Sequence, residues 1–402
     1  MSLKTVKGGA AALAVLALAL LGGCGSGGKT AAKSGESGNG GETKAAGGGI
    51  PIGVVLEKTG GLQDWGRDSE RGMFLALEHL KGQGGIEISL DIRDNNCKPD
   101  QSASEFINLV SVKNVLAVLG AVASSDTRAM KEQANKYKVP LITHASTNVQ
   151  LTKDTEWLYR ICFDDEFQGA VCARFAWDSL KAKKAIVVTD AAQDYSRGLT
   201  ASFTKTYTEL GGTVVEELTY QTGDKIFTSQ VGKLQASEIE CVFTSGYAPE
   251  VGLLLKTARE AGFDKPFLGG DGLSMEQFYR IAGAQVGTGV YICDHAHPDD
   301  PDPKVQKFVT AYKAKFAGAT PGSMAFLGYD AIFAIHDALV RAKAKGELTR
   351  DSVREAIGSI QDLDLVTGRI TMGADHEVKK RAVVLKYQPD GSFKFAAEVK
   401  PE

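Results

Sequence analysis

The chain has 402 residues and a formal net charge of −3 at pH 7, with acidic and basic side chains in nearly equal numbers. The charges are interspersed and form no basic stripe, which excludes nucleic acid as the partner. The roughly 350 residues that follow the N-terminal segment are more than one hydrophobic core usually serves, so the sequence predicts two domains.

Residues 1–23 have the layout of a secretory signal peptide. Two lysines precede an apolar run over 10–21, which is too short to span a bilayer. The ending Leu21-Gly22-Gly23-Cys24 is similar to a bacterial lipobox, which implies cleavage before Cys24 and acylation of that residue. The alternative is an ordinary signal peptide followed by an incidental cysteine. We predict no later segment long and apolar enough to cross a membrane, so we expect an exported lipoprotein, periplasmic or at the cell surface, anchored through Cys24.

Residues 24–49 consist mainly of Gly, Ser, Ala, Lys and Glu, and they include no large apolar side chain. Such a segment cannot bury enough surface to offset its ordering entropy, which predicts a flexible tether. The folded part is therefore expected to begin at Ile50.

After Ile50, strand-like apolar runs alternate with amphipathic helical stretches. This alternation predicts βαβ units with parallel sheets, which is an α/β fold. Strands are predicted to begin at Ile52, Ile86, Leu116, Pro140, Ala185, Thr213, Ile239, Pro266 and Gly289. Helices are predicted over 68–81, 102–112, 127–137, 167–180, 198–210 and 249–261, then a mostly helical segment over 304–360 and strands again after Arg369. There is no long Pro/Gly linker, so we expect short crossovers between the two domains.

Cysteines and short motifs add little chemistry. Without Cys24, an odd number remains (Cys97, Cys162, Cys172, Cys241 and Cys293), so at least one thiol is expected to be free or paired with another molecule; the pairing is not readable. The P-loop-like pattern over 23–30 lies across a cleavage site and a tether, so it is rejected. Cys293, His295, His297, Asp299 and Asp300 could ligate zinc, but without a second ligand pair we favour a strand end with solvent-exposed histidines and expect no metal. Hydrolase and dinucleotide motifs are absent from the folded part.

Candidate ligand-binding residues follow five of the predicted strands. Ligands of open parallel sheets bind beyond the carboxyl ends of the strands, so these loops are expected to converge on one crevice. A hydroxyl at a helix N-terminus suits a carboxylate, a loop carboxylate suits an ammonium, and Tyr offers a wall together with a hydroxyl. The predicted site for a small zwitterion consists of Ser124, Ala145, Thr147, Tyr195, Tyr247 and Asp271, with Trp65 in the loop after the first strand.

At these residues the chain resembles the periplasmic leucine/isoleucine/valine-binding proteins, which are type I substrate-binding proteins of ABC transporters. The resemblance runs from about Ile50 to the C-terminus. It is carried by VLEKTGGLQDWG, LGAVASSDT, PLITHAST, TDAAQDYSRGL, FTSGYAPEVGLLLKTAREAG and FLGGDGLS, which occur in this order.

The resemblance implies a fold and a role for each site residue. Two Rossmann-like lobes joined by three crossovers are expected, one formed by 50–165 with 295–378 and the other by 166–294 with 379–402. Ser124 and Thr147 are implied to hold the α-carboxylate. The Ala145 carbonyl and Asp271 are implied to hold the α-ammonium, with Tyr195 and Tyr247 closing on it and Trp65 lining the side-chain pocket.

Three departures from the family pattern leave branched-chain specificity open. Ala123 stands where a cysteine is frequent, so Cys97 lacks that partner. Asp271 replaces a longer Glu, and His144 replaces a Pro.

The leading hypothesis is a monomeric solute-binding lipoprotein that captures an aliphatic amino acid and delivers it to an ABC permease. It needs no cofactor and has no enzymatic activity. One alternative keeps the fold but binds a small amide or an aromatic acid, and a less favoured one is a secreted hydrolase.

Overall fold

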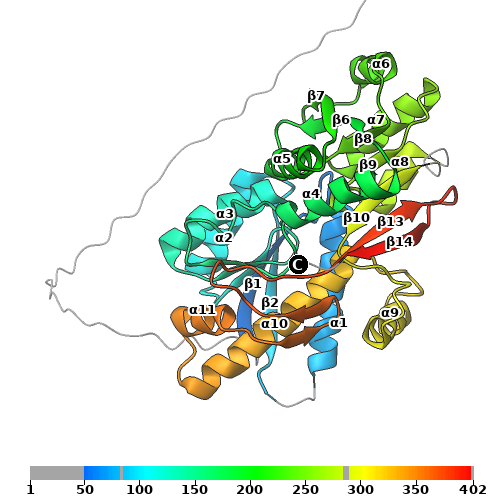
Figure 1. Cartoon of the computed structure of the whole chain (residues 1–402). Coiled ribbons are helices and arrows are strands. Elements are labelled where there is room, and N and C mark those ends of the chain that lie inside the picture. Colours follow the sequence, from blue (N-terminus) through cyan, green and yellow to red (C-terminus); the bar gives the residue numbers. More distant parts are fainter. Residues whose placement is uncertain (1–48, 82–84, 284–288, 400–402) are drawn as a thin grey trace, which may run out of the picture. The chain divides into compact units, whose positions relative to one another are not determined.

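Two mainly parallel sheets carry the fold of the computed structural model, which describes residues 49–81, 85–283 and 289–399 (Figure 1). The predicted signal peptide, Cys24 and nearly all of the tether lie outside these residues. The predicted α/β class is confirmed.

The first sheet has the strand order β2-β1-β3-β4-β5 and is parallel throughout. β1 lies in the interior of this sheet, and its last five residues are buried, as the apolar run predicts. The strands are β1 (Ile50–Leu56), β2 (Ile88–Asp94), β3 (Val118–Gly120), β4 (Leu141–Thr143) and β5 (Leu158–Arg160).

The second sheet has the order β14-β13-β10-β9-β8-β6-β7. Five of its strands are parallel. β13 pairs antiparallel with β10. β14 pairs antiparallel with β13, because a short hairpin joins these two late strands. The strands are β6 (Lys184–Asp190), β7 (Thr213–Tyr220), β8 (Cys241–Thr244), β9 (Phe267–Gly269), β10 (Val290–Asp294), β13 (Ala382–Tyr387) and β14 (Phe393–Val399). β11 (Leu363–Leu365) and β12 (Gly368–Ile370) form a separate small hairpin.

Helices follow most of the parallel strands. They are α1 (Gln63–Leu80), α2 (Pro99–Ser111), α3 (Ser124–Tyr137), α4 (Asp165–Arg174), α5 (Asp194–Glu209), α6 (Thr228–Ala236), α7 (Ala248–Glu260), α8 (Glu276–Ala282), α9 (Pro303–Lys315), α10 (Ser323–Lys345) and α11 (Arg350–Gly358). A π-helical turn (Phe175–Ser179) extends α4, and a 3₁₀ turn, η2 (Asp271–Leu273), follows β9.

The start of α1 differs from the prediction. The helix begins at Gln63 rather than at residue 68, so Trp65 lies on the helix and not in a loop. Gly66 serves close packing, since a Cβ there would lie 2.2 Å from the carbonyl oxygen of Glu57. The first turn of α1 is therefore held directly against the end of β1.

α10 corrects the expectation that no later segment is long and apolar enough to cross a membrane. It has 23 residues, and its most apolar window has a mean hydropathy of 1.3. Within the structure 72% of that window is buried, and α10 lies alongside α1 (Figure 1, orange against blue). Its apolar character thus serves the protein core.

The chain passes between the two sheets three times, after β5, after β10 and before β13. Ion pairs tie the third passage to its surroundings. Glu377 meets Arg160, which is fully buried at the end of β5, at 2.5 Å. Arg381 pairs with Asp300 of the second passage, and the Nζ atom of Lys380 lies 3.6 Å from Asp330 of α10.

All five cysteines of the described part are free thiols, and Cys241 is buried in β8 as predicted. Cys97 donates to the carbonyl oxygen of Thr59 at 3.3 Å and accepts from the backbone N–H of Leu62 at 3.4 Å.

Candidate functional site

The seven predicted site residues all lie at strand ends or on the first turns of helices, and all are buried. Trp65 is on α1, Ser124 begins α3, Ala145 and Thr147 follow β4, Tyr195 is on α5, Tyr247 precedes α7 and Asp271 begins η2. This placement is what an open parallel sheet produces when each strand runs into a helix N-terminus.

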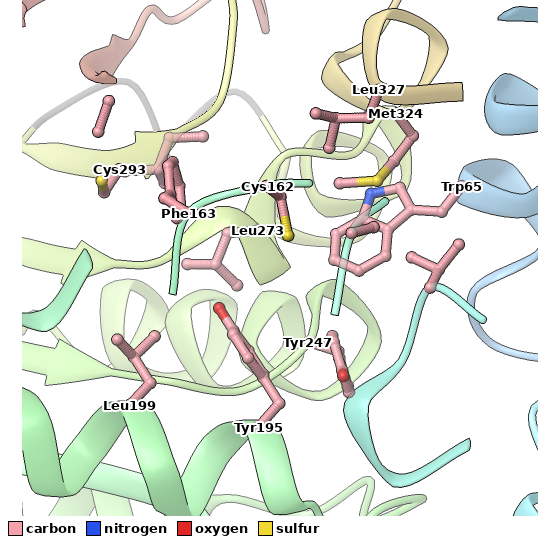
Figure 2. Close-up of a cluster of buried hydrophobic side chains, with 14 of the residues drawn as sticks. Trp65, Cys162, Phe163, Tyr195, Leu199, Tyr247, Leu273, Cys293, Met324 and Leu327 are labelled. Carbon is pink, nitrogen blue, oxygen red and sulfur yellow. The ribbon is translucent and has the colours of Figure 1, made fainter. Parts of the chain in front are cut away.

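Three aromatic rings in contact join a residue that follows the first sheet to residues that follow strands of the second sheet. The rings of Trp65 and Tyr247 meet edge to face at 5.6 Å, and Tyr247 stacks on Tyr195 at 5.1 Å. Trp65 Nε1 also donates to the carbonyl oxygen of Ser274 at 3.1 Å. Figure 2 shows these three rings in one buried cluster with Met324 of α10. The cluster offers an apolar wall with two phenol groups.

The Asp271 carboxylate joins this cluster through Tyr195. Its Oδ1 accepts from the Tyr195 hydroxyl at 2.8 Å and from Gln168 Nε2 at 2.9 Å. Its Oδ2 lies 3.0 Å from His295 Nε2. A carboxylate has about four acceptor sites, so roughly one remains for a further donor. The sequence did not predict either Gln168 or His295 as a partner of Asp271.

A second acidic side chain lies beside Asp271 and was not predicted from the sequence. Asp165, at the start of α4, is fully buried, and neither of its carboxyl oxygens has a hydrogen-bond partner of ordinary geometry. Burial, reinforced by the charge of Asp271, raises the pKa of Asp165 well above its usual range, although the Thr147 side chain and Arg160 oppose this shift.

The histidines after β10 are buried, contrary to the expectation that solvent would surround them. His295 stacks on Phe163 at 3.8 Å and is 3% exposed, and His297 is 5% exposed. They diverge, since His297 instead packs edge to face on Phe393 at 6.5 Å. Among residues 49–81, 85–283 and 289–399, no group of three or more His, Cys, Asp or Glu side chains is arranged to hold a metal.

His144 is a further buried histidine beside the predicted site. Its Nε2 lies 3.0 Å from the Ser69 hydroxyl of α1, whereas its Nδ1 has no hydrogen-bond partner. Burial lowers the pKa of His144 to about 4, with a smaller contribution from His295. The imidazole is therefore neutral at physiological pH.

The two predicted carboxylate-binding residues follow neighbouring strands, Ser124 after β3 and Thr147 after β4. The Ser124 hydroxyl accepts from the backbone N–H of Asn148 at 3.3 Å, which links the loop after β3 to the one after β4. Below it, the Glu57 carboxylate accepts the backbone N–H groups of Val122 and Ala123 at 3.0–3.2 Å. Ser124 and Thr147 are thus in adjoining loops, and their contact with a ligand carboxylate stays a prediction.

A sequence profile described as periplasmic binding protein matches residues 49–392 of the chain. The chain belongs to the periplasmic binding protein family. Membership implies that this binding protein acts outside the cytoplasm, and it agrees with the expectation of a binding function without catalysis. The hydrolase alternative is set aside on this ground.

Relatives of this periplasmic binding protein include amino-acid binders. An amino acid binding protein of Pseudomonas aeruginosa is 33% identical over 270 residues, which are 64% of this chain and 71% of the relative. A second protein of that organism, which binds leucine, isoleucine, valine, threonine and alanine, is 28% identical over 77% of this chain and 82% of its own length.

Solved structures agree in fold. The leucine-binding protein of Thermotoga maritima has a TM-score of 0.83 and 34% identity, covering 88% of this chain and 99% of that one. The substrate-binding protein of a branched-chain amino acid transporter of Streptococcus pneumoniae, in complex with isoleucine, has a TM-score of 0.81 and 31% identity over 88% and 100%. A benzoate complex of a solute-binding protein of R. palustris shares the fold at 21% identity, with a TM-score of 0.79 over 88% and 97%. The predicted type I periplasmic binding protein fold is confirmed.

A pocket of about 490 Å³ lies next to this site without including it. It is lined by Phe163, residues of α4, and Val378, Lys379 and Lys380 of the third passage. Phe163 separates it from His295, which stacks on the same ring.

Proposed function

We propose that this protein captures a free aliphatic amino acid between the strand-end loops of its two sheets and delivers it to an ABC permease. The observation that carries the proposal is the position of the charged groups. The buried Asp271 carboxylate lies at one end of a continuous aromatic cluster, and the N-terminus of α3 with Ser124 follows the adjacent first sheet.

Each end of the ligand has complementary chemistry in this arrangement. A helix N-terminus with free N–H groups and a hydroxyl stabilises a carboxylate. Asp271 supplies the counter-charge for an ammonium, and Trp65 with Met324 supplies apolar surface for a side chain. The relatives that bind leucine or isoleucine support this assignment.

A second candidate is a solute that has a carboxylate and no amine, such as an aromatic acid. It is favoured by the three donors already on Asp271, because they meet much of the hydrogen-bonding capacity of the carboxylate without a ligand.

A thermal-shift screen separates these candidates. A ligand at 100 times its Kd stabilises the folded state by about 2.7 kcal/mol, so we expect leucine, valine or isoleucine to raise the Tm by several degrees. Benzoate and 4-methylpentanoate, the deaminated analogue of leucine, are expected to leave the Tm nearly unchanged. A rise with benzoate and none with any amino acid would reassign the solute class.

We further propose that the mature chain is anchored by lipid on Cys24. Replacing Cys24 with Ala is expected to move the protein from the membrane fraction to the soluble fraction, since acyl chains supply the membrane affinity. The measurement is fractionation of cells that produce either form, with leucine binding of the released variant as the control. Unchanged membrane retention of Cys24→Ala would argue against lipidation.

A further inference from the structure

Two carboxyl groups lie directly behind the predicted carboxylate-binding loop. Glu57 follows β1 and is fully buried, and Asp126 lies in the first turn of α3 and is 2% exposed. They lie at the same short segment, because Glu57 accepts the N–H of Ala123 and Asp126 follows three residues later, where its Oδ1 is buried with no hydrogen-bond partner. They form a buried acid pair that the sequence analysis did not single out.

No cation balances this pair within the described residues, where no Lys, Arg or His forms an ion pair with either carboxyl. The groups that face it are polar or acidic: the Asn95 side chain after β2, the Ser102 hydroxyl and Asp100 of α2, the Cys97 thiol, and Tyr247. Burial and the neighbouring Glu57 raise the pKa of Asp126 to about 9, and burial also raises the pKa of Glu57. The pair therefore holds at least one proton at neutral pH.

The pair is coupled to the ligand site by backbone contacts. Glu57 accepts the N–H groups of Val122 and Ala123, which immediately precede Ser124. The Glu57 backbone also packs against Gly66 in the first turn of α1, and Gly66 directly follows Trp65. A ligand carboxylate bound beside Ser124 would thus bring a further negative charge close to this acid pair.

We propose that Glu57 and Asp126 are positioning residues which hold the β3–α3 loop and retain a proton on which capture of a carboxylate ligand depends. This inference rests on the proposed function. The proton keeps the pair from repelling the ligand carboxylate, so ligand binding makes loss of that proton less favourable. Binding at a pH where the free pair is partly ionised should then draw a proton from solvent.

The test is calorimetric titration of leucine at pH 9 in buffers of different ionisation enthalpy, which gives the number of protons taken up per ligand. We expect wild type to take up about 0.3–0.5 proton more than Asp126→Asn or Glu57→Gln, because a group with a pKa near 9 is half ionised there when free. The ammonium of leucine contributes equally to all variants and cancels in the difference. The control is Asp299→Asn, an exposed carboxylate outside this group, which should keep the wild-type uptake.

The outcomes separate this inference from the proposed function. If wild type binds leucine but takes up no more protons than the titration of free leucine explains, the inference alone is overturned. This result does not depend on whether the variants fold. No leucine binding at any pH overturns the inference together with the proposed function. A second readout needs no ligand: the Tm of wild type should fall more steeply from pH 7 to pH 10 than that of Asp126→Asn. The reason is that the pKa of Asp126 is raised in the folded state, so the stability that its proton contributes is lost as the pH rises towards that pKa.

Discussion

Replacing both Ser124 and Thr147 with Ala is expected to weaken leucine binding by about 2–5 kcal/mol, since each charge-assisted hydrogen bond contributes about 1.5–3 kcal/mol. Ser124 begins α3 and Thr147 is in the adjoining loop, so truncation removes two hydroxyls from one proposed carboxylate site. The measurement is a calorimetric titration of leucine against both proteins at pH 7.

A matched double variant controls for the loss of two hydroxyls. Ser104 and Thr310 are exposed, and each donates only to a carbonyl of its own helix, so their replacement with Ala should leave the Kd unchanged. If the Ser124/Thr147 variant keeps a Kd within threefold of wild type while it remains folded, the carboxylate is bound elsewhere.

Asp271→Asn is expected to cost leucine a few kcal/mol of binding free energy, because the ammonium would be desolvated against a neutral amide. The deaminated analogue 4-methylpentanoate should lose much less. The structure adds a second effect: Gln168 and Tyr195 donate to one oxygen of Asp271 and His295 lies on the other, so the NH₂ of Asn cannot accept on one of these two sides. The Tm of the unliganded variant must therefore be measured beside its affinity.

Asp299→Asn is the matched charge control, because the Asp299 side chain is 80% exposed and lies outside this network. The deciding quantity is the ratio of the Kd values of leucine and 4-methylpentanoate, compared between the variant and wild type. An Asp271→Asn protein that loses leucine and 4-methylpentanoate equally has lost the shape of the site rather than a partner for the ammonium.

The alternation of strands and helices was enough to predict the fold class, because buried parallel strands leave apolar runs that any sheet of this type requires. It failed for β5, which has only three residues and no long apolar run. Asp165 and Gln168 follow β5 in the chain. Because β5 was not predicted, these two residues were not predicted to lie at a strand end, although the adjacent carboxylates Asp164 and Asp165 were a signal in the sequence.

His295 could not be assigned from sequence for a different reason. Its contact with Asp271 spans 24 residues and depends on the pairing of β9 with β10, which places the ends of the two strands side by side. The spacing of His295 and His297 suggested a shared metal site. The two side chains are only two positions apart in the chain, yet they have different surroundings. The proximity of Glu57 to the segment that carries Asp126 was similarly hidden, since it depends on β1 lying beside β3.

The central claim, that one site binds both the carboxylate and the ammonium of an amino acid, is tested most directly by titrating wild-type protein with leucine, 4-methylpentanoate and benzoate under identical conditions. We predict that leucine binds at least 100-fold more tightly than 4-methylpentanoate, which corresponds to about 2.7 kcal/mol, and that benzoate binds no better than the analogue. Tighter binding of 4-methylpentanoate or benzoate than of every amino acid tested would contradict the account.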